Sequence, residues 1–158
     1  MAQYRTSRNV EASFIDFITA ELLADGWTDI NVEKGFPQKY KGMIPLIGVE
    51  ALEIRKQTLE IGGKTKIKYR NVRIRIFGNS DGQRLDLSEW LMEKLEDKDV
   101  PYYKYTITSG AVSEKTLSGR IEILRELENR KELQNTENLE HQDKFRHVFV
   151  YETKVVLS

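Results

Sequence analysis

The sequence predicts an α+β fold in which two amphipathic helices pack on one face of a mixed, largely antiparallel sheet of long hairpins. Three observations support this prediction. Two segments carry apolar residues at the three-and-four spacing of a helical face, several segments alternate apolar and polar residues as strands do, and tight-turn sequences join those strands in pairs. The chain has 158 residues, which is the usual size of one domain. We therefore predict a single domain over 1–158, with a long polar loop at about 126–145.

The first helix is predicted near the N-terminus. Its buried face consists of Val10, Phe14, Phe17, Ile18 and Leu22. Gly26 is expected to end this helix because glycine adopts the left-handed backbone conformation at little cost, and Trp27 is placed to pack back on the last turn. Residues 28–33 then alternate weakly, which predicts a short strand with Ile30 and Val32 facing inward.

A long hairpin is predicted next, with strands over 47–61 and 64–77 joined by the turn Gly62-Gly63. In the second strand Ile67 and Tyr69 share one face, whereas Val72 and the isoleucines that follow share the other. This change of phase near Arg70-Asn71 predicts a β-bulge or a strong bend.

The second half of the chain repeats the pattern of a helix, a strand and a hairpin. Ser80 with Gln83 has the spacing of a capping box, and it precedes a helix whose buried face is Leu87, Trp90, Leu91 and Leu95. Pro101 begins a strand in which Tyr103, Tyr105 and Ile107 alternate with polar residues. Residues 120–124 and 147–156 are predicted to pair as a further hairpin.

The sequence offers no catalytic centre, metal site or cofactor site that we would assign. It has no cysteine, and its two histidines, His141 and His147, have no serine motif of a hydrolase around them. Asp81 with Asp86, and His141 with Asp143, lack a metal-ligand spacing. The turn over 78–82 has no phosphate-binding lysine and is explained by the capping box. The 25 basic and 25 acidic side chains give zero net charge, which disfavours nucleic-acid binding by the whole domain.

Two alternatives stay open at this level. Asp29 followed by Glu53-Ile54-Arg55 resembles the acid and acid-x-lysine pattern of a restriction-endonuclease-like, magnesium-dependent nuclease, with arginine in place of the lysine. A nucleic-acid module is suggested by Tyr102, Tyr103 and Tyr105 and by a basic strand. That strand is also explained as one whose basic side chains face solvent or a neighbouring subunit. They would then lie opposite Glu50, Glu53 and Glu60 on the adjacent strand. The residues of the basic strand are Lys66, Lys68, Arg70, Arg73 and Arg75.

The layout resembles the tail terminator proteins of long-tailed bacteriophages over nearly the full chain. The segments that carry this resemblance are VEASFIDFITAELLADGW, VRIRIFGNSDGQ, DLSEWLMEKLED, YYKYTI and the hairpin GRIEIL with FRHVFVYETKVV. The resemblance implies a non-enzymatic virion subunit without a cofactor. Such a subunit closes into a ring, a hexamer on assembly, that caps the tail tube, ends its polymerisation and docks the tail to the head-side connector. Other phage neck or head–tail joining proteins share this small α/β arrangement and are the alternative that the resemblance leaves open.

The resemblance also gives roles to the two long loops. It implies that the protein is made in the host cytoplasm, is built into the tail of the virion without a membrane, and meets DNA only as DNA passes through the ring lumen. In the loop over 36–46 the candidate protein-interface residues are Phe36, Tyr40, Met43 and Ile44, unless this loop covers its own sheet edge. In the polar loop the candidates for lining the lumen or ordering on assembly are Glu128, Arg130, Lys131, Glu137, Glu140 and Asp143.

Overall fold

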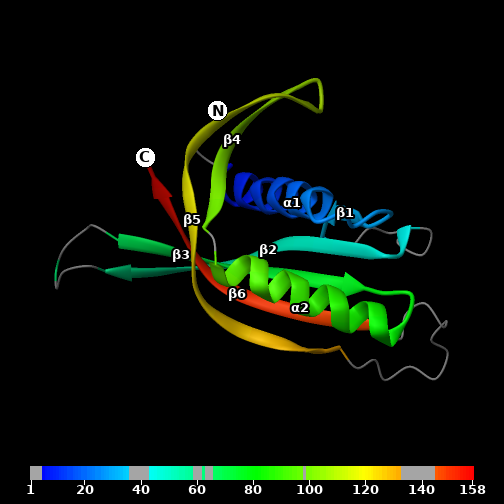
Figure 1. Ribbon diagram of the computed structural model, residues 1–158. Helices are drawn as coiled ribbons and strands as arrows, with labels where there is room; N and C mark the ends of the chain where they lie inside the picture. Colours follow the sequence, from blue (N-terminus) through cyan, green and yellow to red (C-terminus); the bar gives the residue numbers. More distant parts are fainter. Residues whose placement is uncertain (1–4, 36–42, 59–61, 63–65, 98, 133–144) are drawn as a thin grey trace.

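The computed structural model describes residues 5–35, 43–58, 62, 66–97, 99–132 and 145–158 (Figure 1). Its elements in chain order are α1 (Thr6–Ala24), β1 (Asn31–Lys34), β2 (Leu46–Thr58), β3 (Lys66–Phe77), α2 (Asp81–Asp97), β4 (Val100–Thr108), β5 (Ala111–Lys131) and β6 (Arg146–Leu157). The described strands form one sheet in the order β1-β2-β3-β6-β5-β4. Neighbouring strands are antiparallel except for β1 and β2, which are parallel. The predicted α+β fold class is therefore confirmed.

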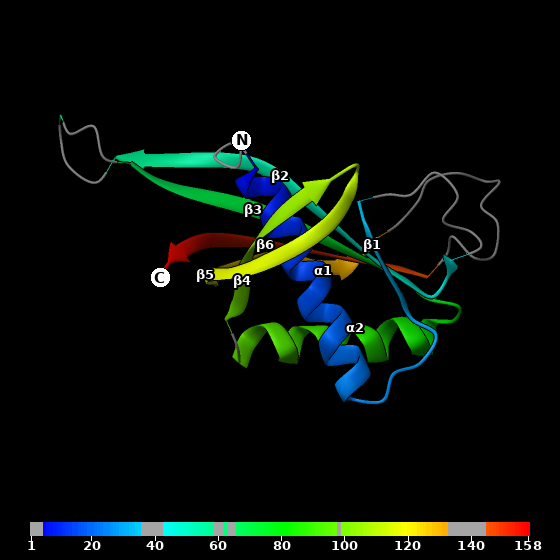
Figure 2. The same ribbon diagram turned by 90° about the horizontal axis from the view of Figure 1, so that it is seen from above.

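Both helices pack on the same side of the strongly twisted sheet, where they share one hydrophobic core (Figure 2). The helix residues at its centre are Val10, Phe14, Ile18 and Leu22 of α1 with Leu87, Leu91 and Leu95 of α2. Alternate strand residues that face the helices, among them Ile74 and Phe149, complete this core. The helices also touch each other, because Lys94 of α2 binds Glu21 of α1 at 3.2 Å, and the Trp27 ring just after α1 meets the Trp90 ring edge to face with centroids 6.3 Å apart. The two predicted buried faces are thus confirmed, with Phe17 and Trp90 only partly buried.

The helix boundaries follow the predicted signals. At the end of α1, Gly26 has a φ of 77°, its N–H donates to the Leu23 carbonyl at 3.3 Å, and the Trp27 N–H donates to the Leu22 carbonyl at 3.0 Å. At the start of α2, the Ser80 hydroxyl accepts from the Gln83 N–H at 3.1 Å, and the Gln83 side-chain oxygen accepts from the Asn79 N–H at 2.7 Å. The turn between β3 and α2 is therefore used for helix capping.

The irregularity predicted in the long hairpin lies on the opposite strand. Ala51 pairs with Val72 and Ile54 pairs with Arg70, so two residues of β2 face Asn71 alone. Strand β3 pairs with β6 without interruption over the same stretch. The bulge therefore belongs to β2. The change of phase in β3 has another cause. From Val72 to Ile76 the apolar residues of β3 face the core, whereas Ile67 and Tyr69 lie before the core begins and are on the opposite face of the strand.

The first part of the segment predicted as a polar loop is a strand, and residues 133–144 of that segment lie outside the described residues. Strand β5 continues from Ala111 to Lys131 and pairs along its length with β4 and then β6. Residues 126–131, which were assigned to the loop, are thus part of the sheet. All six side chains are exposed and five of them are polar, with Leu127 the exception, and cross-strand hydrogen bonds to β6 hold the backbone in place regardless of side-chain polarity.

Candidate functional site

Two hairpin arms extend past the part of the sheet that the helices cover (Figure 1). We call them the β2–β3 arm, in which residues 53–58 of β2 pair with 66–70 of β3, and the β4–β5 arm, in which residues 103–108 of β4 pair with 111–117 of β5. Every side chain over 53–58 and over 111–117 is exposed. Three of them are large and apolar, since Ile54 is 45% exposed, Val112 is 59% exposed and Leu117 is 62% exposed. The arms therefore bring apolar and polar strand surface into solvent.

The β4–β5 arm is anchored to α1 by polar contacts. The Tyr105 hydroxyl donates to Asp16 at 2.6 Å, and the Ser13 hydroxyl accepts from the Tyr103 N–H at 3.0 Å. Burial and the hydrogen bond to Asp16 raise the pKa of the Tyr105 hydroxyl, so this group stays protonated as a donor. The three tyrosines that suggested single-strand binding are thus engaged within the chain, because Tyr102 is buried in the core and Tyr103 packs against Tyr105.

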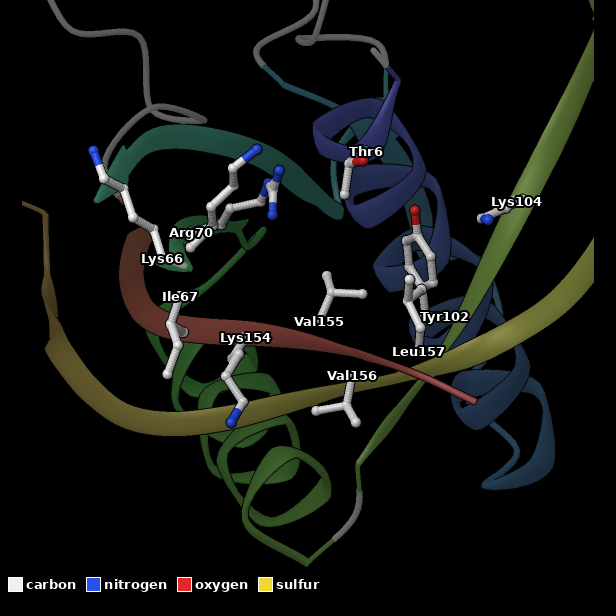
Figure 3. Close-up of a pocket in the computed structure, with 11 residues that line it drawn as sticks. Thr6, Lys66, Ile67, Arg70, Tyr102, Lys104, Lys154, Val155, Val156 and Leu157 are labelled. Carbon is white, nitrogen blue, oxygen red and sulfur yellow. The ribbon is translucent and has the colours of Figure 1, made fainter. Parts of the chain in front are cut away.

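A pocket of about 810 Å³ opens between the two arms, and we call it the cationic groove (Figure 3). Five basic side chains and no acidic one line it, and the valines of β6 lie between the basic side chains of β3 and Lys104 of β4. The complete lining is Thr6, Lys66, Ile67, Lys68, Arg70, Tyr102, Lys104, Lys154, Val155, Val156 and Leu157.

The groove exists because strands β3 and β6, which pair in the centre of the sheet, diverge toward one end. Strand β3 pairs with β6 only as far as Arg70, which faces Thr153. Beyond this point β3 stays with β2, whereas β6 continues beside β5 until Leu157 faces Gly119. At the fork, the Thr153 hydroxyl donates to the Arg70 carbonyl at 2.8 Å and Arg70 Nε donates to the Ser7 hydroxyl at 3.3 Å. Burial lowers the pKa of the Arg70 guanidinium from its ordinary value.

The basic strand does not form one continuous cationic stripe. Arg73 lies on the face away from the helices and binds Glu50 of β2 at 3.0 Å, as the cross-strand interpretation predicted. Arg75 binds Glu132 at 3.1 Å. Glu53 accepts a hydrogen bond from Asn71 at 2.6 Å, and Glu60 lies outside the described residues. Of the five predicted cations, Lys66, Lys68 and Arg70 line the groove.

His147 belongs to a buried polar cluster between α2, β5 and β6. Arg84 Nη1 lies 2.8 Å from His147 Nδ1 and Asn129 Oδ1 lies 2.6 Å from His147 Nε2. Because an arginine can only donate, Nδ1 is the acceptor and Nε2 carries the proton that Asn129 accepts. Burial and the nearby Arg84 charge lower the pKa of His147 to about 4. The imidazole is therefore neutral and holds the helix to the sheet.

The acids of the nuclease hypothesis do not come together. Asp29 precedes β1, whose Asn31 pairs with Leu46, while Glu53 lies seven residues further along β2. At about 3.3 Å per residue, this separates the two acids by roughly 30 Å. Within the described ranges there is also no cluster of three histidine, aspartate or glutamate side chains arranged to hold a metal ion.

The loop candidates have mixed outcomes. Phe36 and Tyr40 lie outside the described residues, as do Glu137, Glu140, Asp143 and His141. Met43 and Ile44 are half-buried, and the Met43 carbonyl accepts from Asn31 Nδ2 at 2.6 Å, so these two residues join β1 to β2. Glu128, Arg130 and Lys131 are exposed side chains of β5 and not members of a loop.

Sequence reasoning missed the cationic groove. Its lining comes from α1, β3, β4 and β6, which are far apart in the chain, so no local pattern marks it.

Among the described residues, no helix is both long and apolar enough to cross a membrane. No protein-family model matches the sequence, and no curated protein is significantly similar to it.

Proposed function

We propose that this chain is a structural virion protein without enzymatic activity. In this proposal it forms a homo-oligomeric ring, hexameric on assembly, at the head-proximal end of a bacteriophage tail. The ring caps the tail tube, ends tube polymerisation and docks the tail to the head-side connector, while DNA passes through its lumen. The observation that carries the proposal is the pair of strand arms that extend into solvent beyond the hydrophobic core.

The arms support assembly for an energetic reason. A two-stranded hairpin is marginally stable in water when no further strand or helix covers it. Both arms expose a full row of side chains, and the β4–β5 arm exposes Val112 and Leu117. A ring needs two different and complementary surfaces on each subunit, joined head to tail. Arms that leave the core in two directions supply separate surfaces for such neighbours (Figures 1 and 2).

The test uses the full chain with tubes assembled from the major tail-tube protein of the same genome. We expect electron microscopy to show added density at one end of each tube, and we expect capped tubes to stop growing when more tube protein is supplied. Light scattering on the chain alone accompanies this test, because a subunit that assembles only on the tube stays monomeric by itself. A chain that is monomeric at all concentrations and binds neither tube end contradicts the proposal.

A further inference from the structure

Within the part of the chain that the structure describes, two surfaces of opposite charge are not neutralised by ion pairs. In the cationic groove, Lys66, Lys68 and Lys104 form no ion pair with any described residue. On the outer face of α2 the same is true of the exposed acids Asp86, Glu89, Glu93 and Glu96. Elsewhere many charges are paired, as in Glu50 with Arg73. Although the chain has equal numbers of acidic and basic side chains, positive charge therefore gathers in the groove and negative charge on the outer face of α2.

We infer that the cationic groove is the docking site for helix α2 of a second copy of this chain. This inference rests on the proposed ring assembly and names the contact between neighbouring subunits. The groove of one subunit receives the acidic face of the next, whose own groove receives a third. A contact between two different surfaces is heterologous, which is the type that builds a ring when its rotation closes.

The acidic face cannot reach the groove of its own chain. Leu87, Leu91 and Leu95 are buried in the core, and they fix the rotation of α2 about its axis. The acids lie on the opposite side of the helix, at spacings of three and four residues, and point to solvent. Turning them toward the groove would expose the three leucines, so contact between these acids and a groove requires a second molecule.

The size of the groove fits a segment of helix. Two helical turns with their side chains are about 11 Å long and about 10–12 Å wide, which corresponds to roughly 850–1,200 Å³, and a docked helix enters a groove with only one of its sides. The groove has a volume of about 810 Å³. Two turns are also the length that separates Glu89 from Glu96, because seven residues rise by about 10.5 Å. The acids are thus spread over the length of helix that the groove accommodates.

Each surface also carries an exposed leucine next to its charges. Leu85 of α2 is 47% exposed, and Leu157 at the edge of the groove is 62% exposed. Leu85 lies one helical turn before Glu89, on the same side of α2. Charge complementarity mainly sets the orientation and the rate of encounter, whereas apolar area removed from water contributes affinity. The groove floor of Val155 and Val156 offers such area, which a phosphate backbone does not use.

Charge reversal tests the inference. We expect Lys66→Glu/Lys68→Glu to weaken self-association by roughly tenfold or more, and Glu89→Lys/Glu93→Lys to do the same, because each places like charges in contact. The variant with all four changes restores opposite charges and should recover association. As a matched control, adding Glu126→Lys/Glu128→Lys to the groove variant restores the net charge with two exposed acids of β5 that lie outside both arms and outside α2, and it should not recover association.

Cysteine cross-linking locates the contact, because the chain has no cysteine of its own. A Lys104→Cys chain mixed with a Glu96→Cys chain should form a disulfide-linked heterodimer under mild oxidation. Lys104→Cys mixed with Thr28→Cys, an exposed position outside α2, should not.

Three outcomes overturn the inference. If the wild-type chain caps tubes and the groove variants cap them equally well, the docking assignment is wrong while the proposed function stands. A groove variant that only the control reversals rescue rules out α2 as the occupant. Salt-sensitive binding of a DNA oligonucleotide that is lost in Lys66→Glu/Lys68→Glu assigns the groove to phosphates instead. By contrast, the absence of both tube capping and self-association in the wild-type chain removes the proposed function as well.

Discussion

Strand β2 passes through two environments within its 13 residues. From Leu46 to Val49 every residue is buried, whereas from Glu53 to Thr58 every residue is exposed. The bulge at Leu52 and Glu53 lies at the boundary between these two parts. The same contrast separates the helix-covered centre of the sheet from its two arms.

This contrast indicates that the stability of the subunit and its assembly depend on different residues. A fully buried aliphatic or aromatic side chain contributes about 1.5–3 kcal/mol to folding, so the centre dominates the free energy of unfolding. Exposed cross-strand pairs contribute only about 0.2–1 kcal/mol each. Strand length beyond the core therefore adds little to the stability of the single chain, and it is available for contacts with neighbours.

The largest effect is expected from a cavity in the centre. Phe14 is fully buried between α1 and the sheet, and Phe14→Ala should lower the free energy of unfolding by about 3–5 kcal/mol. Urea denaturation followed by circular dichroism measures this value. A loss below about 1 kcal/mol would show that the packing of α1 on the sheet is not what stabilises the subunit.

A smaller effect in the centre depends on pH. The pKa of His147 is lowered from 6.5 to about 4 in the folded chain by burial and by Arg84. The unfolded chain therefore binds the proton first, and the stabilisation is complete above pH 6.5 and is lost as the pH falls toward 4. This predicts a loss of about 2 kcal/mol between pH 7 and pH 5. His147→Gln, compared by urea denaturation at both pH values, should lose much less; an equal loss would assign the pH dependence to other groups.

A third comparison uses the same substitution in both regions. Ser80 caps α2, and Ser80→Ala should reduce the free energy of unfolding by about 1 kcal/mol. Ser113 lies on the β4–β5 arm, where its hydroxyl donates to the Thr106 carbonyl at 3.2 Å in solvent. Ser113→Ala is expected to change stability by less than about 0.5 kcal/mol. Thermal denaturation of both variants distinguishes the regions, and equal losses would remove the distinction.

The smallest effect on folding is expected at the exposed apolar residues of the β4–β5 arm. Val112→Ser with Leu117→Ser shortens two apolar side chains that are more than half exposed. The free energy of unfolding of the monomer should therefore change by less than about 0.5 kcal/mol in the same urea experiment. A loss of several kcal/mol would mean that Val112 and Leu117 themselves contribute to the packing of the single chain.

Sequence patterns predicted the elements whose signals are local. The helices, their caps at Gly26 and Ser80, and the β2–β3 and β5–β6 hairpins were foreseen because periodicity and turn chemistry act over a few residues, whereas the pairing of β4 with β5 was not predicted. The end of β5 was wrong, because residues 126–131 are held in the sheet by backbone bonds to β6 and carry no alternation. The groove was not foreseen, since it depends on where β3 and β6 diverge. That divergence is a property of the pairing register and not of either strand alone.

The measurement that bears most directly on the separation of folding from assembly is a paired one on the Val112→Ser/Leu117→Ser chain. Its free energy of unfolding and its binding to the ends of tail tubes are determined side by side with those of the wild-type chain. We predict an unchanged free energy of unfolding, within about 0.5 kcal/mol, and the loss of the ring at the tube end. A variant that still caps tubes normally, or one that is destabilised as strongly as Phe14→Ala, would contradict this account.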